Sequence, residues 1–425
     1  MKYQSPILFI IFLLGLSLCT LQCAGQPGKS AINAEKYILA ADSKAIPLEE
    51  KIIIGCEQFD AYLPALKNKR VGMVVNQTST VNDDFHLVDA LIAKGIKVQA
   101  VFAPEHGFRG TADAGEKIKN GVDVKTGLPI VSLYGKNKKP NADMLKDIDV
   151  LIFDIQDVGA RFYTYISTMH YIMEAGAENN IPVVVLDRPN PNGHYVDGPI
   201  LQKSYKSFVG MHAIPVVHGL TVGELANMIN GEGWLANGIK CDLTVVNATG
   251  YTHKKPWSLN IKPSPNLPND WSIALYPSLC FFEGTVVSVG RGTNKQFQLY
   301  GHPSFKDQPF QFTPQPMQGA KYPKHDGQSC GGVYLTKESE SGLQQLNQLE
   351  LSYLMNAFKW YKEANGSADG FFLKNNFINK LAGTSDLKNQ ILAELTEEEI
   401  RASWEPALSE YKELRKKYLL YPDFD

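Results

Sequence analysis

A cluster of acidic, basic and aromatic side chains follows an apolar run that ends at residue 153. It contains Asp154, Asp157, Arg161, Tyr163 and Tyr165. A carboxylate can transfer a proton, an arginine can bind an anion bidentately, and a tyrosine can stack on a sugar ring or hydrogen-bond to it. The alternative is a structural ion pair beside core aromatics, which fits Asp154 better than Asp157. Asp157, Arg161 and the two tyrosines are therefore candidate site residues.

A second candidate group lies in the sequence APEHGFRG, residues 103–110. Glu105 follows an apolar run, and partial burial can raise the pKa of a glutamate far enough for it to act as a general acid. His106 is its neighbour, and Arg109 is suited to holding a carboxylate bidentately. The alternative is a solvated loop with an ordinary ion pair. The functional interpretation is acid–base chemistry on a polar or anionic ligand.

Further polar residues follow apolar runs elsewhere. Asn76 ends one such run, and Arg188 and Asn190 follow another in the sequence DRPNPNG. Glu283 and Arg291 lie in EGTVVSVGRGTN, whose glycines allow close packing around a ligand or another loop. A β-hairpin is the alternative for that stretch. We add these five residues to the candidate site.

The runs that precede most of these residues have the pattern of buried parallel strands. They are mostly apolar, as expected for strands covered on both faces, at residues 70–75, 98–103, 129–133, 147–153 and 183–186. Helical spacing between them predicts helices at residues 84–94 and 164–177. Alternating strands and helices predict an α/β fold with a Rossmann-like, doubly wound parallel sheet. Ligands of such sheets bind past the carboxyl ends of the strands, where the candidate residues lie.

The second half of the chain has a different texture. Capping boxes at Thr221 and at Thr396 open two further helices, and another helix is expected at residues 341–364. Proline, aromatic residues and short β-like runs dominate between residues 241 and 330. We therefore predict an α/β domain at residues 51–238 and an α+β domain at residues 239–425.

The N-terminus has the pattern of an export signal. Lys2 precedes an apolar run at residues 7–18, followed by Cys19, Cys23 and small residues. Processing as a lipoprotein at Cys23 and ordinary cleavage near Ala24 are the two alternatives. We expect an export signal at residues 1–25, a tether at residues 26–50, and a mature protein that works in the periplasm or anchored to the outer membrane.

Several classes of function are disfavoured. A formal net charge of −2 argues against nucleic acid as a partner and against a polybasic membrane surface. Dinucleotide, P-loop and metal-site motifs do not occur, so we expect no cofactor and no metal. The sequence GQSCG at residues 327–331 has the form GxSxG but lacks a preceding strand and a following helix, so it does not predict the activated serine of an esterase. Four widely spaced cysteines, Cys56, Cys241, Cys280 and Cys330, are expected to be buried free thiols.

Taken together, the motifs resemble one bacterial family. They are NQTS at residue 76, APEHGFRG at 103, DIQDVGARFYTY at 154, DRPNP at 187, EGTVVSVGRGT at 283 and the ending IRASWEPALSEYKELRKKYLLYP at 400–422. Their order and extent, about residues 52–422, are similar to the DUF1343 family, the exo-β-N-acetylmuramidases of the NamZ type.

The resemblance implies a Rossmann-like domain followed by a smaller domain, with the active cleft between them. It implies hydrolysis of β-1,4-linked N-acetylmuramic acid (MurNAc) from the non-reducing end of peptidoglycan fragments such as MurNAc-GlcNAc. Glu105 would be the family's glutamate and the general acid. Asp157 or the 2-acetamido group of the substrate would be the second participant, and an arginine would bind the lactyl carboxylate. A lipoprotein that binds muropeptides without cleaving them is the alternative. In either case we expect membrane contact only through a possible N-terminal lipid anchor.

Overall fold

The computed structural model describes residues 51–82, 84–105, 107–109, 121–135, 137–336 and 346–424. The predicted export signal, the predicted tether and His106 lie outside the described residues. No helix in the described ranges is long and apolar enough to cross a bilayer. Cys56, Cys241, Cys280 and Cys330 are buried free thiols, which confirms that prediction.

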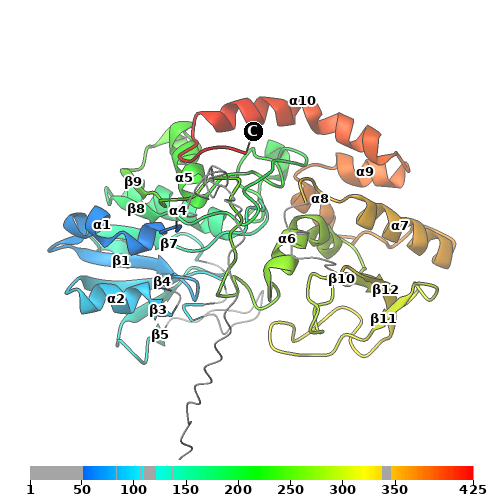
Figure 1. Cartoon of the computed structure of the whole chain (residues 1–425), viewed down its shortest axis with the longest axis horizontal. Helices are drawn as coiled ribbons and strands as arrows, with labels where there is room; N and C mark the ends of the chain where they lie inside the picture. The colour runs from blue at the N-terminus through cyan, green and yellow to red at the C-terminus, as the bar shows by residue number, and fades with distance from the viewer. Residues whose placement is uncertain are drawn as a thin grey trace, which may run out of the picture. The chain divides into compact units, whose positions relative to one another are not determined.

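A seven-stranded sheet organises the first part of the chain (Figure 1). Its order is β5-β6-β4-β1-β7-β8-β9, and every pairing is parallel except that of β5 with β6. The strands are β1 Arg70–Val75, β4 Lys97–Ala103, β5 Gly121–Val122, β6 Pro129–Ser132, β7 Val150–Asp154, β8 Val183–Leu186 and β9 Leu243–Val246. When the parallel strands are numbered along the chain, their spatial order is 3-2-1-4-5-6, the order of a Rossmann fold. The predicted fold class is confirmed.

Helices cover both faces of the sheet. Alternate residues of each strand point to opposite faces, so each strand contributes to both cores. On β7, Val150 and Ile152 share a core with α1, Phe59–Leu66, and α2, Leu87–Ala93. Leu151 and Phe153 share the other core with α4, Tyr165–Glu178, and α5, Val222–Gly231. A short helix, α3 at Ala142–Leu145, also contributes to this second core. Continuous apolar strands are thus the direct consequence of burial on two sides.

The predicted helix at residues 84–94 begins later than its spacing indicated. A hairpin of β2, Thr80–Val81, and β3, Phe85–His86, occupies its start. The side chain of His86 then caps α2, with Nδ1 accepting from the backbone N–H of Val88 at 3.2 Å. Helical periodicity alone could not distinguish this two-residue strand from a first helical turn. The predicted capping boxes of α5 and of α10, at Thr221 and Thr396, are both present.

The second half contains a small antiparallel sheet in the order β10-β12-β11 and several helices. The elements are α6 Asp270–Leu279, β10 Leu299–His302, β11 Phe310–Phe312, β12 Cys330–Tyr334, α7 Ser352–Asn365, α8 Phe377–Ala382, α9 Asp386–Leu392 and α10 Glu397–Lys416. Short 3-10 helices are η1 Gly55–Glu57, η2 Lys203–Tyr205, η3 Ala236–Gly238 and η4 Cys280–Gly284. The last two residues of the GxSxG sequence already belong to β12, so a strand and not a helix follows its serine, and it is not a nucleophile elbow.

The domain boundary predicted near residue 238 needs a correction. β9 lies after it and pairs with β8 through four residues, from Leu243 to Val246. Cutting the chain at residue 238 would remove this edge strand from the central sheet. The sheet therefore ends after Val246, and residues 50–425 group as one compact unit. The sequence did not reveal this because β9 has only one buried residue, which makes its apolar pattern weak.

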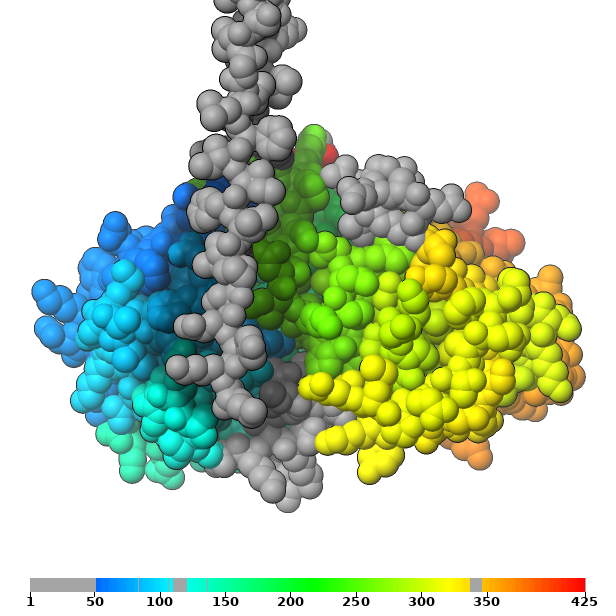
Figure 2. Space-filling view, turned by 60° about the horizontal axis from the view of Figure 1, so that its bottom comes forward, coloured from blue at the N-terminus to red at the C-terminus, as the bar shows by residue number. Residues whose placement is uncertain are grey.

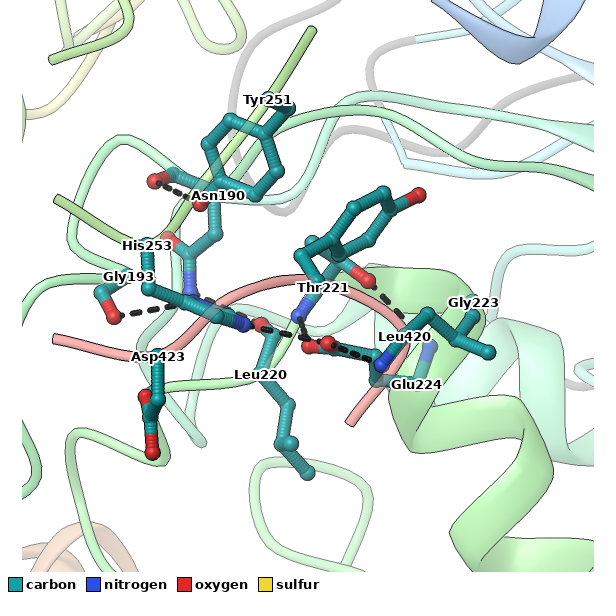
Figure 3. Close-up of polar contacts among 12 residues, drawn as sticks. Asn190, Gly193, Leu220, Thr221, Gly223, Glu224, Tyr251, His253, Leu420 and Asp423 are labelled. Carbon is teal, nitrogen blue, oxygen red and sulfur yellow. Dashed lines mark hydrogen bonds and ion pairs between the residues drawn. The ribbon is translucent and has the colours of Figure 1, made fainter. Parts of the chain in front are cut away.

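The C-terminal segment closes over the carboxyl end of β8. The hydroxyl of Tyr421 donates to Asp187 Oδ2 at 2.5 Å, and the backbone N–H of Leu420 donates to Glu224 Oε1 at 2.8 Å. His253 Nε2 lies 3.1 Å from the same Glu224 oxygen (Figure 3). Arg415 adds two hydrogen bonds to the carbonyl of Gly219. Burial raises the pKa of Asp187 to about 6. The polar end of β8 is therefore covered by Leu420 and Tyr421, which follow α10. Figure 1 shows α10 running across the molecule before this segment.

Candidate functional site

A cavity of about 830 Å³ lies at the carboxyl ends of β4, β6 and β7. Its first wall comes from the sheet and includes Glu105, Tyr134 and residues 162–165. Its second wall comes from residues 264–267, from residues between 276 and 297, and from residues 319–324. In Figure 2 the yellow segment of the second wall lies on the opposite side of the view from the blue and cyan sheet segments. The volume falls in the range of roughly 300–1,000 Å³ that is usual for small-ligand sites.

Glu105 is a partly exposed side chain in this cavity, two residues after β4. The hydroxyl of Tyr134, which follows β6, donates to Glu105 Oε1 at 3.3 Å. Thr164 Oγ1, just before α4, lies 3.4 Å from Oε2. Burial and the neighbouring Glu105 carboxylate raise the pKa of Tyr134 to about 12, so its hydroxyl keeps its proton at neutral pH. The hydroxyl groups of Tyr134 and Thr164 thus orient a carboxyl group that faces the cavity.

Tyr163 and Tyr165 line the same cavity, but their hydroxyl groups serve the protein. Tyr163 donates to the carbonyl of Pro263 at 2.7 Å, and Tyr165 lies 3.4 Å from the same oxygen and from the carbonyl of Glu105. The two rings meet edge to face, with centroids 5.0 Å apart. Burial raises the pKa of Tyr165, and the side chain of the fully buried Asn76 offsets only part of this. The two tyrosines hold the segment around Pro263 and present ring surface to the cavity, whereas Asn76 does not line it.

The second wall carries most of the positive charge. Arg291 Nη2 forms an ion pair with Glu283 Oε1 at 2.7 Å, and both side chains are more than a quarter exposed. Lys324 donates to the carbonyls of Phe282 and Thr285 at 2.9 and 2.7 Å, and burial lowers its pKa to about 8. Lys321 also lines this wall. Three cations and one anion make this wall suited to an anionic ligand group.

Asp157 is not brought into the cavity. It is 4% exposed, its Oδ2 accepts from the backbone N–H of Gly159 at 2.7 Å, and His218 Nε2 lies 3.6 Å away. It caps the turn after β7 and faces a buried histidine. The prediction that Asp157 works beside Glu105 is therefore corrected. Within the described lining, Glu283 is the carboxylate that shares the cavity with Glu105.

Two of the predicted substrate-binding arginines are buried in the protein. The guanidinium of Arg161 is fully buried and donates to four backbone carbonyls, those of Pro199, Ile214, Leu381 and Ala382. Arg188 forms a bidentate ion pair with Asp154, at 2.6 and 2.9 Å, and is 5% exposed. Both arginines join segments that are far apart in the chain. Neither lines the cavity, so their predicted roles in substrate binding are corrected.

The remaining predicted residues that the structure describes also have structural partners. Arg109 lies outside the cavity lining and forms a bidentate ion pair with Asp123, at 3.1 and 2.8 Å. Asn190 donates to the carbonyl of Leu220 and accepts from the N–H of Asn192, which stabilises the turn after β8. Of the predicted set, the cavity gathers Glu105, Tyr163, Tyr165, Glu283 and Arg291.

Sequence reasoning missed Tyr134, Thr164 and Lys324. Tyr134 follows a short strand of the same sheet, so the strand-end rule that selected Glu105 would also have selected it. Lys324 lies in a loop without periodicity, and no sequence signal marks it. Among the described residues, no three His, Cys, Asp or Glu side chains are grouped closely enough to hold a metal ion.

Comparisons with known proteins agree with this architecture. Two family models, described as the N-terminal and C-terminal parts of the exo-beta-N-acetylmuramidase NamZ, match residues 71–271 and 274–421. The chain is 40% identical over 383 residues to the peptidoglycan beta-N-acetylmuramidase NamZ of Bacillus subtilis strain 168, which covers 85% of this chain and 89% of that protein.

Two solved structures of DUF1343 family proteins from Bacteroides fragilis are also similar. One has a TM-score of 0.80 and 46% identity, and covers 88% of this chain and all of that chain. The other has a TM-score of 0.75 and 32% identity, and covers 87% and 99%. The resemblance found in the sequence motifs is confirmed. The chain belongs to the NamZ family of exo-β-N-acetylmuramidases and is a glycoside hydrolase.

Proposed function

We propose that this enzyme removes β-1,4-linked MurNAc from the non-reducing end of peptidoglycan fragments, with Glu105 as the general acid. The observation that carries the proposal is the position of Glu105 and Arg291 in one cavity, on walls from different parts of the chain. A carboxyl group and a cationic wall match a substrate that has a scissile glycosidic bond and a carboxylate. The curated relative acts on peptidoglycan by its name, which supports the same substrate class.

In the proposed reaction, Glu105 donates its proton to the glycosidic oxygen as the bond from that oxygen to C1 of MurNAc breaks. The leaving sugar departs with the proton as a hydroxyl group. Water then adds to C1 and gives one proton to the carboxylate of Glu105, which restores the acid. Tyr134 and Thr164 orient the carboxyl group, because their hydroxyls approach its two oxygens.

The second participant must stabilise the developing positive charge at C1. Asp157 lies outside the cavity lining. Among the described residues of that lining Glu283 is the other carboxylate, and the 2-acetamido oxygen of the substrate is the second candidate. Glu283 is already paired with Arg291 at 2.7 Å, which lowers its availability as a nucleophile. We therefore favour the acetamido oxygen, with Glu283 holding Arg291 in place.

We further propose that Arg291 binds the lactyl carboxylate. Arg109, Arg161 and Arg188 do not line the cavity, and each has bidentate or multiple protein partners, whereas Arg291 lines the cavity with its side chain 28% exposed. Lys324 adds a second positive charge nearby. A hydrogen bond to a charged group is worth about 1.5–3 kcal/mol.

Replacement of Arg291 by Met should therefore lower kcat/KM for an aryl MurNAc glycoside about 10- to 100-fold. The matching GlcNAc glycoside lacks the lactyl group, so its slow turnover should hardly change. The measurement is a comparison of kcat/KM for both glycosides in each variant. Arg70→Met is the matched control, because Arg70 begins β1 and lies at the other end of the sheet.

Removal of Arg291 also leaves Glu283 without its partner, and this charge could itself repel the substrate. The double variant Arg291→Met, Glu283→Gln removes that charge. A loss that persists in the double variant identifies the missing cation as its cause. An equal loss for the MurNAc and GlcNAc glycosides would contradict the assignment of Arg291.

We also propose that the enzyme is exported and acts in the periplasm or from a lipid anchor in the outer membrane. The support is the N-terminal pattern of Lys2, the apolar run and Cys23, together with a substrate that lies in the cell wall. Mass spectrometry of the mature N-terminus distinguishes lipidation at Cys23 from cleavage near Ala24.

A further inference from the structure

Tyr322 differs from the other aromatic residues of the cavity in its exposure. It lines the cavity, yet it is 95% exposed. Five other aromatic residues of the lining are buried, with at most 9% exposure: Phe162, Tyr163, Tyr165, Tyr276 and Phe297. Two more, Tyr134 and Phe377, are half-buried. An aromatic side chain left in water at the mouth of a polar cavity has apolar surface available for a ligand.

The loop that carries Tyr322 is anchored on both sides of it. After Tyr322, Lys324 donates to the carbonyls of Phe282 and Thr285, and His325 Nε2 lies 2.7 Å from the carbonyl of Val286. Before it, Asn266 Nδ2 donates to the carbonyl of Gly319 at 2.7 Å. These contacts place the backbone of the loop without using the ring of Tyr322.

Gly292, the neighbour of Arg291, packs closely against the same loop. Gly292 has a φ of +83°, and a Cβ atom there would lie 2.7 Å from Pro323 Cβ and from the carbonyl oxygen of Gln315. The glycine-rich sequence around Arg291 therefore packs directly against the loop of Tyr322. As a result, the backbone at Tyr322 is held beside the segment that carries Arg291.

We propose that Tyr322 is the platform for the sugar on the leaving-group side of the cleaved bond. This inference rests on the proposed function, because an exo-acting enzyme holds the terminal sugar inside its cavity and the next sugar at the mouth. A pyranose ring has one face of C–H groups, which can cover the ring of Tyr322 and remove apolar surface from water. The buried aromatics and Glu105 would then surround the terminal sugar, and Tyr322 would bind the next one.

The test compares two substrates that differ in the leaving group. One is the disaccharide MurNAc-GlcNAc, and the other is the β-fluoride of MurNAc, whose leaving group has no ring to stack. Tyr322→Ala should lower kcat/KM for the disaccharide about tenfold and leave kcat/KM for the fluoride unchanged. Tyr322→Phe and Tyr322→Trp should keep most of the disaccharide activity, because each retains a ring.

Phe85→Ala is the matched control. Phe85 is another exposed aromatic residue, at 46%, and it lies on β3 outside the cavity lining. If the wild-type enzyme is active and the Tyr322→Ala variant loses neither activity, or loses both equally, the inference about Tyr322 is overturned. The proposed function is not affected by that result. A wild-type protein that cleaves neither substrate would instead overturn the proposed function, and the inference with it.

Discussion

Replacement of Glu105 by Gln should lower kcat/KM for MurNAc-GlcNAc by about 10²- to 10⁴-fold. The amide of glutamine cannot protonate the glycosidic oxygen, and a sugar hydroxyl is a poor leaving group without a proton. The fold should remain intact, since Gln has the same shape and its oxygen can still accept from Tyr134. The measurement is steady-state hydrolysis of the disaccharide, with thermal unfolding as the check on folding.

A substrate with an activated leaving group separates loss of the acid from loss of binding. The leaving group of a 2,4-dinitrophenyl glycoside of MurNAc departs without protonation. Glu105→Gln should therefore retain far more of its activity on this substrate than on the disaccharide. Glu178→Gln is the matched control, because Glu178 ends α4 and its side chain is 40% exposed. Near wild-type hydrolysis of the disaccharide by Glu105→Gln would refute the assignment.

Replacement of Arg188 by Met should lower the free energy of unfolding by about 3–5 kcal/mol. Asp154 is fully buried, and without Arg188 its charge would have lost its bidentate partner. The folded fraction should keep its KM for substrate, because Arg188 lies outside the cavity lining. Urea unfolding gives the stability, and kinetics at low urea give the KM.

Arg70→Met provides the comparison for this effect. Arg70 forms a similar bidentate pair with Asp149, but its side chain is 35% exposed. Exposed pairs contribute only about 0–1 kcal/mol, so its loss should be small. A raised KM with unchanged stability in Arg188→Met would contradict the structural role of Arg188 and return it to the substrate-binding residues.

The fold was largely predictable because two-sided burial leaves a direct record in the sequence. The runs that became β1 and β8 are apolar at nearly every position, so their bounds could be read directly. β9 escaped because its side chains are mostly exposed or half-buried, and periodicity carries no signal for such an edge strand. The boundary near residue 238 was misplaced for the same reason.

The site was only partly predictable. The end of a strand indicates where a side chain lies along the sheet, but it does not indicate whether that side chain points into the cavity or into the protein. Glu105 and Arg188 both follow buried strands, yet one faces the cavity and the other pairs with Asp154 inside the protein. The sequence does not show that Arg188 pairs with Asp154, which lies 34 residues earlier in the chain. Lys324 and Tyr322 come from an aperiodic loop, so only the tertiary structure brings them to the cavity.

The most direct measurement is the release of sugar from a defined disaccharide by the purified wild-type protein. We predict that MurNAc-GlcNAc, with MurNAc at the non-reducing end, yields free MurNAc and GlcNAc by mass spectrometry. The isomer GlcNAc-MurNAc, which presents the other sugar at its non-reducing end, should remain uncut. A protein that binds MurNAc-GlcNAc but releases no MurNAc would contradict this account and identify a muropeptide-binding protein instead.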